Sequence, residues 1–150
     1  MSHIRSLVVF LVIVVGGGLI IGITTAPGAW YAALEKPSFN PPNWIFAPVW
    51  TTLYVFIAIA GWRTWLGQRR DNVMKVWWVQ LTLNFLWSPV FFFAHRMDIA
   101  LGIILLLFTA ICAFITFSWR TNRIAAVLFL PYIAWVGFAS VLNASLLYLN

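Results

Sequence analysis

The chain has 150 residues, of which 63% are hydrophobic and only 8% are charged. So few charges cannot cover a water-facing surface, and the composition therefore excludes a soluble globular protein and indicates an integral membrane protein. The net charge of +6 does not indicate a nucleic-acid partner, because the basic residues are scattered near the ends of apolar runs and form no single patch.

Five uncharged runs are each long enough to cross a hydrocarbon core of about 30 Å, which takes about 20 apolar residues in a helix. We expect helices at approximately residues 6–26, 44–66, 74–95, 98–119 and 122–148. A β-barrel is excluded, because segments such as Ile103 to Phe108 are apolar on every face. The first run could instead be a secretory signal peptide, but it is longer than the usual 7 to 15 apolar residues. The predicted fold is all-α: a single five-helix transmembrane domain over residues 1–150, with one long proline-rich loop between the first two helices.

The distribution of basic residues predicts the orientation of this bundle. Lys36 and Arg96 are expected on one side of the membrane. The other side would carry Arg5, Arg63, Arg69, Arg70, Lys75, Arg120 and Arg123. By the positive-inside rule, the N-terminus is then cytoplasmic and the first loop faces away from the cytoplasm.

Glycines and prolines indicate where the helices pack closely or become irregular. Gly18 and Gly22 form a small-residue face on the first helix, which permits close contact either within the bundle or between protomers. We favour contact within the bundle. Pro89 and Pro131 fall inside the third and fifth helices, where a missing N–H predicts local bends.

Polar residues inside the third and fifth helices each need a hydrogen-bond partner, because a buried unpaired amide is costly. Asn143 is expected to have a structural role. Asn84 shares a helix face with Gln80, Trp87 and Phe91, so it could contact a ligand as well as neighbouring helices.

The ten tryptophans fall into two groups. Those near the cytoplasmic boundary are expected to form an interfacial belt: Trp62, Trp65, Trp77, Trp78 and Trp119. Trp87 and Trp135 lie well inside their helices, where each indole N–H should find an internal acceptor.

Groups for ordinary catalysis are sparse. Each acid lies in a loop, the two histidines lie at opposite boundaries, and Cys112 is alone, so we expect no metal site and no bound cofactor. What remains is a lining of rings and amides that suits a flat, lipophilic ligand. Phe39, Trp44 and Phe46 in and after the first loop could form a lid over it.

Three motifs resemble one known family. They are P-x-x-x-P-P-x-x-x-F-x-P-V-W from Pro37 to Trp50, N-F-L-W-S-P-x-F-F from Asn84 to Phe92, and P-Y-x-x-W-x-x-F-A-x-x-L-N from Pro131 to Asn143. Their order and spacing resemble the translocator protein family, also called TspO/MBR or tryptophan-rich sensory proteins and formerly peripheral benzodiazepine receptors. The short chain resembles the bacterial members.

The resemblance implies a ligand site at the end of the bundle that faces the first loop. The residues expected to contact the ligand are Tyr31, Phe46, Trp50, Tyr54, Asn84, Trp87, Phe91, Trp135, Ala139 and Leu142. Ala139 resembles a small residue of the fifth helix that affects drug affinity in the family. The expected ligands are porphyrins and other tetrapyrroles, isoquinoline carboxamide or benzodiazepine drugs, and in some members cholesterol. Tyr148 is not followed by the Lys or Arg of the cholesterol pattern, so a porphyrin is the preferred ligand here.

Several functions remain open from the sequence. A receptor or sensor for tetrapyrroles is the first hypothesis, and facilitated transport of porphyrin or sterol is the second. A third is light-dependent porphyrin degradation, for which Trp50 and Trp135 would be the candidate residues. A ligand-free scaffold is the fourth. The resemblance also implies membrane lipids as partners, homodimers as a family behaviour, and a bacterial envelope location in which the outer membrane is not excluded.

Overall fold

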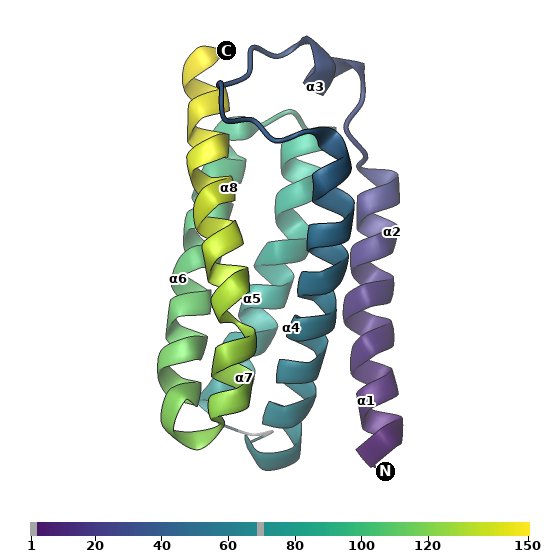
Figure 1. Cartoon of the computed structure of the whole chain (residues 1–150), viewed down its shortest axis with the longest axis vertical. Helices are drawn as coiled ribbons and strands as arrows, with labels where there is room; N and C mark the ends of the chain where they lie inside the picture. The colour runs from purple at the N-terminus through teal and green to yellow at the C-terminus, as the bar shows by residue number, and fades with distance from the viewer. Residues whose placement is uncertain (1–2, 69–70) are drawn as a thin grey trace.

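The structure, a computed structural model, describes residues 3–68 and 71–150. Within these ranges, five helical spans are long and apolar enough to cross a membrane, namely His3–Thr24, Asn43–Gly67, Asn72–Phe93, Met97–Thr121 and Arg123–Leu149. The expected all-helical bundle of five membrane spans is therefore confirmed (Figure 1). Arg69 and Arg70, which contributed to the charge comparison, lie outside the described residues.

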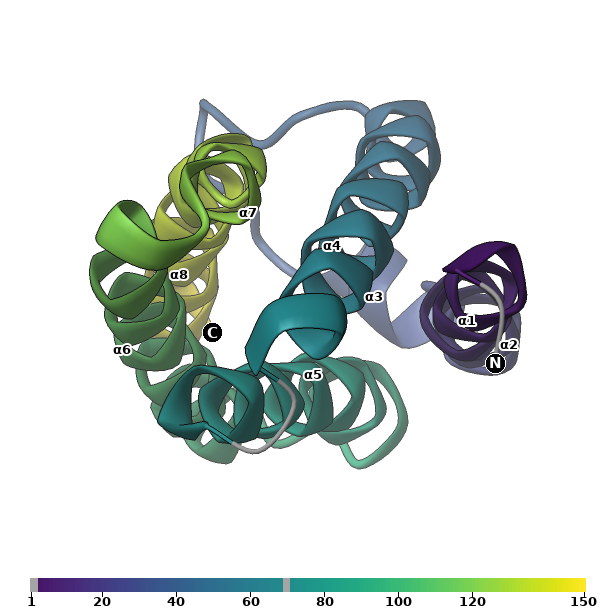
Figure 2. The ribbon, with the colours of Figure 1, turned by 90° about the horizontal axis from the view of Figure 1, so that it is seen from below.

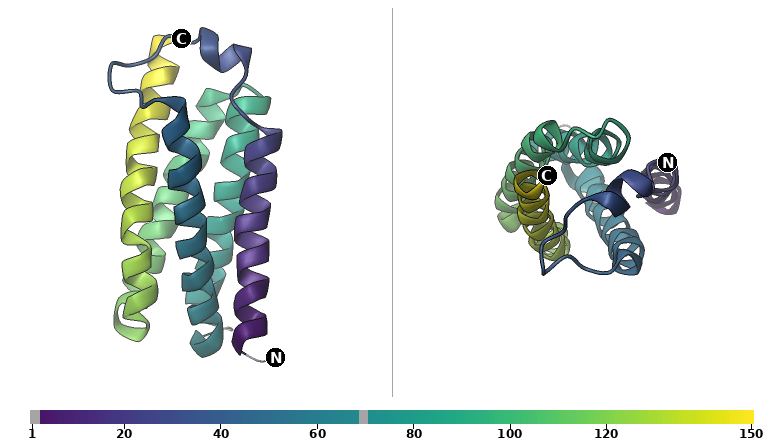
Figure 3. Two further views of the ribbon diagram at one scale, coloured as in Figure 1. Left: turned by 45° about the vertical axis from the view of Figure 1, so that its right-hand side comes forward. Right: turned by 90° about the horizontal axis from the view of Figure 1, so that it is seen from above.

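The first two spans are joined by the only connection with a helix of its own among the described residues. The first span consists of α1 (His3–Leu11), the π-helical turn η1 (Val12–Gly16) and α2 (Gly17–Thr24). After the short helix α3 (Ala29–Ala33) in the loop, the second span begins with the 3-10 turn η2 (Asn43–Ile45) and continues as α4 (Phe46–Gln68). The loop and α3 cross one end of the bundle, beside the C-terminus (Figures 1 and 3).

Both internal prolines coincide with irregular helix geometry, as expected. The third span, α5 (Asn72–Ser88), widens into the π-helical turn η3 (Pro89–Phe93), where the Ala94 N–H donates to the Pro89 carbonyl at 2.9 Å. The fourth span is α6 (Met97–Thr121). The fifth is α7 (Arg123–Leu128) followed by α8 (Leu130–Leu149), and Pro131 lies in the first turn of α8, where a missing N–H is tolerated.

The helices pack around a shared core. α4 packs against α1 on one side and α7 on the other, α5 packs against α6, and α6 packs against α8. Viewed along the bundle, the N-terminal span lies at the edge, beside α4 (Figure 2). It packs closely on α4 through α1 and η1 and much less through α2. The bundle is therefore looser at the end that the loop covers.

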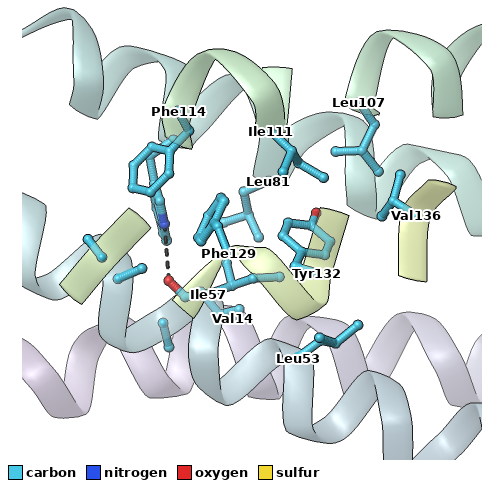
Figure 4. Packing of buried hydrophobic residues seen from close by; sticks show 14 of the residues in the cluster. Val14, Leu53, Ile57, Leu81, Leu107, Ile111, Phe114, Phe129, Tyr132 and Val136 are labelled. Carbon is cyan, nitrogen blue, oxygen red and sulfur yellow. Dashed lines mark hydrogen bonds between the residues drawn. The ribbon is translucent and has the colours of Figure 1, made fainter. Parts of the chain in front are cut away.

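Large aromatic and aliphatic side chains fill the core, including Ile111, Phe114, Phe129 and Val136 (Figure 4). Trp77 belongs to this core and is 0% exposed, so the prediction that it is a belt residue is wrong. Its indole packs over Gly61, where a side chain would overlap the ring.

Two other tryptophans behave as the belt predicts. Trp78 and Trp119 are 40% and 41% exposed, and both lie near the ends of their spans opposite the loop that carries α3. A half-exposed indole at this level matches the usual preference of tryptophan for the boundary between hydrocarbon and water.

Asn143 joins three elements. Its Oδ1 accepts a hydrogen bond from the Trp87 indole N–H at 3.1 Å, and its Nδ2 donates to the Met97 carbonyl at 3.0 Å. The expected structural role of Asn143 is confirmed, and so is the internal acceptor expected for Trp87.

Candidate functional site

An aromatic cavity lies between α2, α4 and α5, beneath the loop that carries α3. Its volume is about 440 Å³. Its wall consists of Gly18, Leu19, Ile21, Gly22, Ile23, Thr25, Ala26, Pro27, Tyr31, Asn43, Phe46, Ala47, Trp50, Thr51, Tyr54, Asn84, Trp87, Ser88 and Phe92. The wall is mainly apolar, and the cavity is within the range of about 300–1,000 Å³ that is usual for small-molecule sites.

Two glycines of α2 shape one side of the cavity. A Cβ at Gly18 would overlap the ring of Tyr54 on α4, so the glycine allows this ring to lie against the α2 backbone. A Cβ at Gly22 would meet no atom within 4 Å. The small-residue face expected on the first helix therefore packs within the bundle at Gly18 and is left open at Gly22.

Stacked and edge-on rings form the opposite wall. Trp50 and Tyr54, one turn apart on α4, have ring centroids 5.6 Å apart. Trp87 on α5 is stacked at 5.2 Å on Phe91, which lies behind it and is 1% exposed. These contacts hold the indoles of Trp50 and Trp87 in place before any ligand is bound.

Few polar groups belong to this wall. The hydroxyls of Thr25, which directly follows α2, and Ser88 on α5 are hydrogen-bonded at 2.6 Å, which ties the two spans together near the loop. Deeper in the wall, Asn84 Nδ2 donates to the Tyr132 hydroxyl at 2.7 Å, and its Oδ1 has no hydrogen-bond partner.

The loop closes the water-facing end of the cavity. Tyr31 on α3 is buried, and its hydroxyl donates to Asn40 Oδ1 at 3.2 Å. Burial raises the pKa of Tyr31 above its ordinary value, although the hydrogen bond with Asn40 opposes this shift, so the phenol stays neutral at physiological pH. Trp30 stacks on the His95 ring at 4.2 Å, which attaches α3 to the connection between the third and fourth spans.

A second attachment joins the loop to the end of α8. The Glu35 N–H donates to Asn150 Oδ1 at 2.9 Å, and Asn150 Nδ2 donates to the Glu35 carbonyl at 3.0 Å. The side-chain amide of Asn150 thus pairs with both the backbone N–H and the backbone carbonyl of Glu35.

The side of the cavity between α2 and α4 is more open than the loop side. Leu19 and Ile23 line the cavity and are 46% and 77% exposed. Thr51, across from them on α4, is also exposed. Because these residues belong to membrane spans, this side of the cavity borders the region that lipid occupies.

The structure places some of the sequence-predicted site residues in the cavity wall and others outside it. Six of the ten expected contacts line the cavity, namely Tyr31, Phe46, Trp50, Tyr54, Asn84 and Trp87. Phe91 supports Trp87 from behind. Ala139 and Leu142 are buried in the helix packing and are not part of the cavity wall.

Trp135 lies elsewhere. It lines a shallow groove between α4 and α8, with Pro48, Pro131 and Ala134 among its neighbours. Its indole nitrogen is buried without a hydrogen-bond partner, so the internal acceptor expected for this N–H is not found. Its ring contacts Phe46, with centroids 5.9 Å apart, and this is its link to the cavity wall.

Sequence reasoning missed several wall residues. Gly22 was noted for packing and not for the space it leaves. Thr25 carried no motif, and Ser88 belongs to the N-F-L-W-S-P-x-F-F motif but was not assigned to the site. Their positions at the loop-facing ends of the first and third spans were the available signal. Within the part of the chain that the structure describes, no three potential ligands come together as a metal site.

The fold and the cavity define the class of this protein as a five-span helical membrane protein with an internal aromatic site. The model of the TspO/MBR family matches residues 8–149, and the chain therefore belongs to this family. It is similar to the protein CrtK of Rhodobacter capsulatus, with 37% identity covering 86% of this chain and 83% of that protein. The tryptophan-rich sensory protein of Cereibacter sphaeroides is 34% identical over 86% of this chain and 82% of its own length. Human translocator protein is 39% identical over 76% of this chain and 70% of its own length.

Proposed function

We propose that this protein is a membrane receptor or sensor that binds a tetrapyrrole, such as protoporphyrin, in the cavity between α2, α4 and α5. The observation that carries the proposal is the wall of indole and phenol rings around a preformed space of about 440 Å³. Flat conjugated ligands stack favourably on such rings. The names of the relatives, translocator protein and tryptophan-rich sensory protein, agree with a protein that recognises a ligand.

The loop offers a partner for the carboxylates of a porphyrin. Tyr31 lines the cavity, and Lys36 Nζ lies 4.9 Å from the centre of its ring. Within the described residues, Lys36 makes no ion pair, and its ammonium group donates to the carbonyls of Ala32 and Leu34. A carboxylate that emerges past Tyr31 would therefore meet an unneutralised cation.

The proposed contacts follow the cavity wall. We assign direct contact to Tyr31, Phe46, Trp50, Tyr54, Asn84 and Trp87. Phe91 would act by holding Trp87. Trp135, Ala139 and Leu142 would reach the ligand only after a rearrangement of the fifth span.

Replacing Trp50 with phenylalanine should lower protoporphyrin affinity by about twofold to tenfold, because stacking on an indole contributes about 0.5–1.5 kcal/mol beyond the area it buries and the smaller ring keeps part of this contribution. The measurement is a titration of purified protein followed by tryptophan fluorescence and corrected for absorption by the porphyrin. Trp135→Phe is the matched control, since it removes one indole outside the cavity wall. Unsaturable quenching, equal in the parent and in both variants, would mean that porphyrin only partitions into the micelle.

Facilitated transport is a second candidate, favoured by the opening between α2 and α4 toward lipid. Under this proposal the cavity takes its ligand from the bilayer and releases it when the loop opens. Net movement of porphyrin across sealed vesicles distinguishes transport from binding alone.

Light-dependent degradation would instead yield product in light and not in darkness, and it would depend on Trp50 more than on Trp135, because only Trp50 lines the cavity.

Removing the Asn150 side chain should loosen the loop. Asn150→Ala deletes two hydrogen bonds between α8 and Glu35, each with a net value of about 1 kcal/mol. We expect porphyrin to bind and dissociate about threefold to tenfold faster, with little change in Kd, as measured by stopped-flow fluorescence. Ser145→Ala on the same helix is the control, because that hydroxyl bonds only within α8. Equal rates in Asn150→Ala and the parent would show that this attachment does not limit ligand exchange.

We also propose a bacterial envelope location with the N-terminus in the cytoplasm. Within the described residues, Arg63, Lys75, Arg120 and Arg123 lie at the end of the bundle opposite the loop. Lys36 and Arg96 belong to the loop end. This asymmetry supports the orientation through the positive-inside rule.

A further inference from the structure

A chain of three buried polar side chains runs from the cavity wall into the core. Asn84 Nδ2 donates to the Tyr132 hydroxyl at 2.7 Å, and this hydroxyl donates to Gln80 Oε1 at 2.9 Å. We infer that Gln80 and Tyr132 act as positioning residues that make the Asn84 carbonyl a hydrogen-bond acceptor for the ligand, so that the site selects flat lipophilic ligands with an N–H or O–H donor. This inference rests on the proposed function, because it assigns a ligand preference to the same cavity.

The direction of these two hydrogen bonds depends on which neighbour receives the single proton of the Tyr132 hydroxyl. This proton is donated to Gln80 Oε1, and Gln80 Nε2 has no hydrogen-bond partner among the described residues. Because this proton is donated to Gln80, the hydroxyl oxygen can only accept from Asn84. The Asn84 amide must then turn its nitrogen toward Tyr132. Its oxygen is left over, and it has no partner among the described residues.

The free acceptor is costly in the empty protein. Asn84 is only 5% exposed, and Tyr132 and Gln80 are fully buried. A buried carbonyl without a hydrogen bond costs about 1–3 kcal/mol relative to a paired one. A ligand that donates to this oxygen recovers that cost, whereas a ligand with only acceptors does not.

Of the three residues, only Asn84 belongs to the cavity wall. Its oxygen is covered in the empty cavity, so the ligand must shift a wall side chain or turn the amide slightly to reach it. Such side-chain changes on binding are common. Gln80 and Tyr132 do not line the cavity, and Tyr132 lies among the core residues Ile111, Phe129 and Val136 (Figure 4). Any effect of these two residues on ligand preference must therefore pass through Asn84.

The hydrogen bonds that link Gln80, Tyr132 and Asn84 could also run in the opposite direction. If Gln80 offers no acceptor, the Tyr132 proton has only the Asn84 oxygen to bind, and the Asn84 amide must rotate. The nitrogen of Asn84 is then free, and the site offers a donor in place of an acceptor. Removing Gln80 should therefore reverse the ligand preference without changing the cavity wall.

Three flat probes of nearly equal shape test this inference: carbazole has an N–H donor, dibenzofuran has an oxygen acceptor, and fluorene has neither. Their affinities for the purified protein are measured by equilibrium dialysis against empty micelles of the same detergent. In the parent protein we expect carbazole to bind about tenfold tighter than fluorene, and dibenzofuran to bind no tighter than fluorene.

In Gln80→Leu, the advantage of carbazole should disappear and dibenzofuran should become the tightest of the three, while fluorene affinity stays the same. In Tyr132→Phe, which keeps the ring, the Asn84 amide is free to turn either way, and carbazole and dibenzofuran should bind within about threefold of each other. Ser118→Ala is the control, because Ser118 is also buried and unpartnered but belongs to α6. The Ser118→Ala variant should bind the three probes in the same order of affinity as the parent protein.

The possible results separate the inference from the proposed function. If neither carbazole nor protoporphyrin shows saturable binding to the folded parent, both are overturned. If fluorene binds but carbazole has no advantage, the cavity remains a ligand site and the inferred preference is wrong. An equal loss of affinity for all three probes in Gln80→Leu would indicate disturbed packing and would contradict the positioning role.

Discussion

Gly61→Ala should reduce the stability of the folded bundle by about 1–3 kcal/mol, which is the usual cost of forcing extra atoms into a packed core. A Cβ at this position would overlap the six-membered and pyrrole parts of the Trp77 indole. The indole is fully buried and cannot move freely, because its N–H donates to the Ile57 carbonyl at 3.0 Å, the bond drawn beside Ile57 in Figure 4. The Phe10 ring also packs edge-to-face with the Trp77 indole, with ring centroids 5.1 Å apart.

The measurement is thermal or denaturant unfolding in a fixed detergent, with Gly67→Ala as the matched control. Gly67 lies on the same helix, and a Cβ there would meet nothing within 4 Å. This control should be neutral or slightly stabilising, since alanine favours a helix over glycine by about 1 kcal/mol at most. If both variants unfold alike, α4 and α5 do not pack through Trp77 as described.

This contact also shows how far the sequence could predict the fold. The five spans follow from the lengths of the apolar runs and are all present. The position of Trp77 does not follow, because a tryptophan near a helix end suits the membrane boundary and a buried contact equally well. Gly61 decides the outcome, and its partner lies on another helix. Hydropathy along one chain carries no information about such a pair.

The candidate site was predictable to a similar extent. Trp50, Asn84 and Trp87 were expected from motifs and line the cavity. Trp135 was expected for the same reason and faces a different groove. Spacing along a helix fixes which residues share a face, but the rotation of that helix against its neighbours depends on packing over the whole bundle. For the fifth span, this rotation directs Tyr132 into the core and Trp135 toward α4.

The Gly22→Leu substitution should lower porphyrin affinity by about a hundredfold, or about 2.8 kcal/mol. Gly22 is part of the cavity wall, and nothing lies within 4 Å of the position that its Cβ would take. A leucine side chain would therefore enter the space that the ligand needs without displacing any core residue. Folding should be unaffected, because leucine is a better helix former than glycine.

Gly16→Leu is the control for this substitution. Gly16 belongs to the same span, also has nothing within 4 Å of its would-be Cβ, and is not part of the cavity wall. Its porphyrin affinity, measured by the same fluorescence titration, should equal that of the parent.

Ala139→Thr distinguishes the two locations that the motifs allowed for the ligand. Ala139 is buried in the core behind the wall, so a ligand between α2, α4 and α5 would sense this change only through helix packing. With the ligand in the described cavity, Gly22→Leu lowers affinity about a hundredfold at unchanged stability, whereas Ala139→Thr lowers stability more than affinity. The opposite pattern would place the ligand against α8, near Trp135 and Leu142, and would require the fifth span to rearrange when the ligand binds.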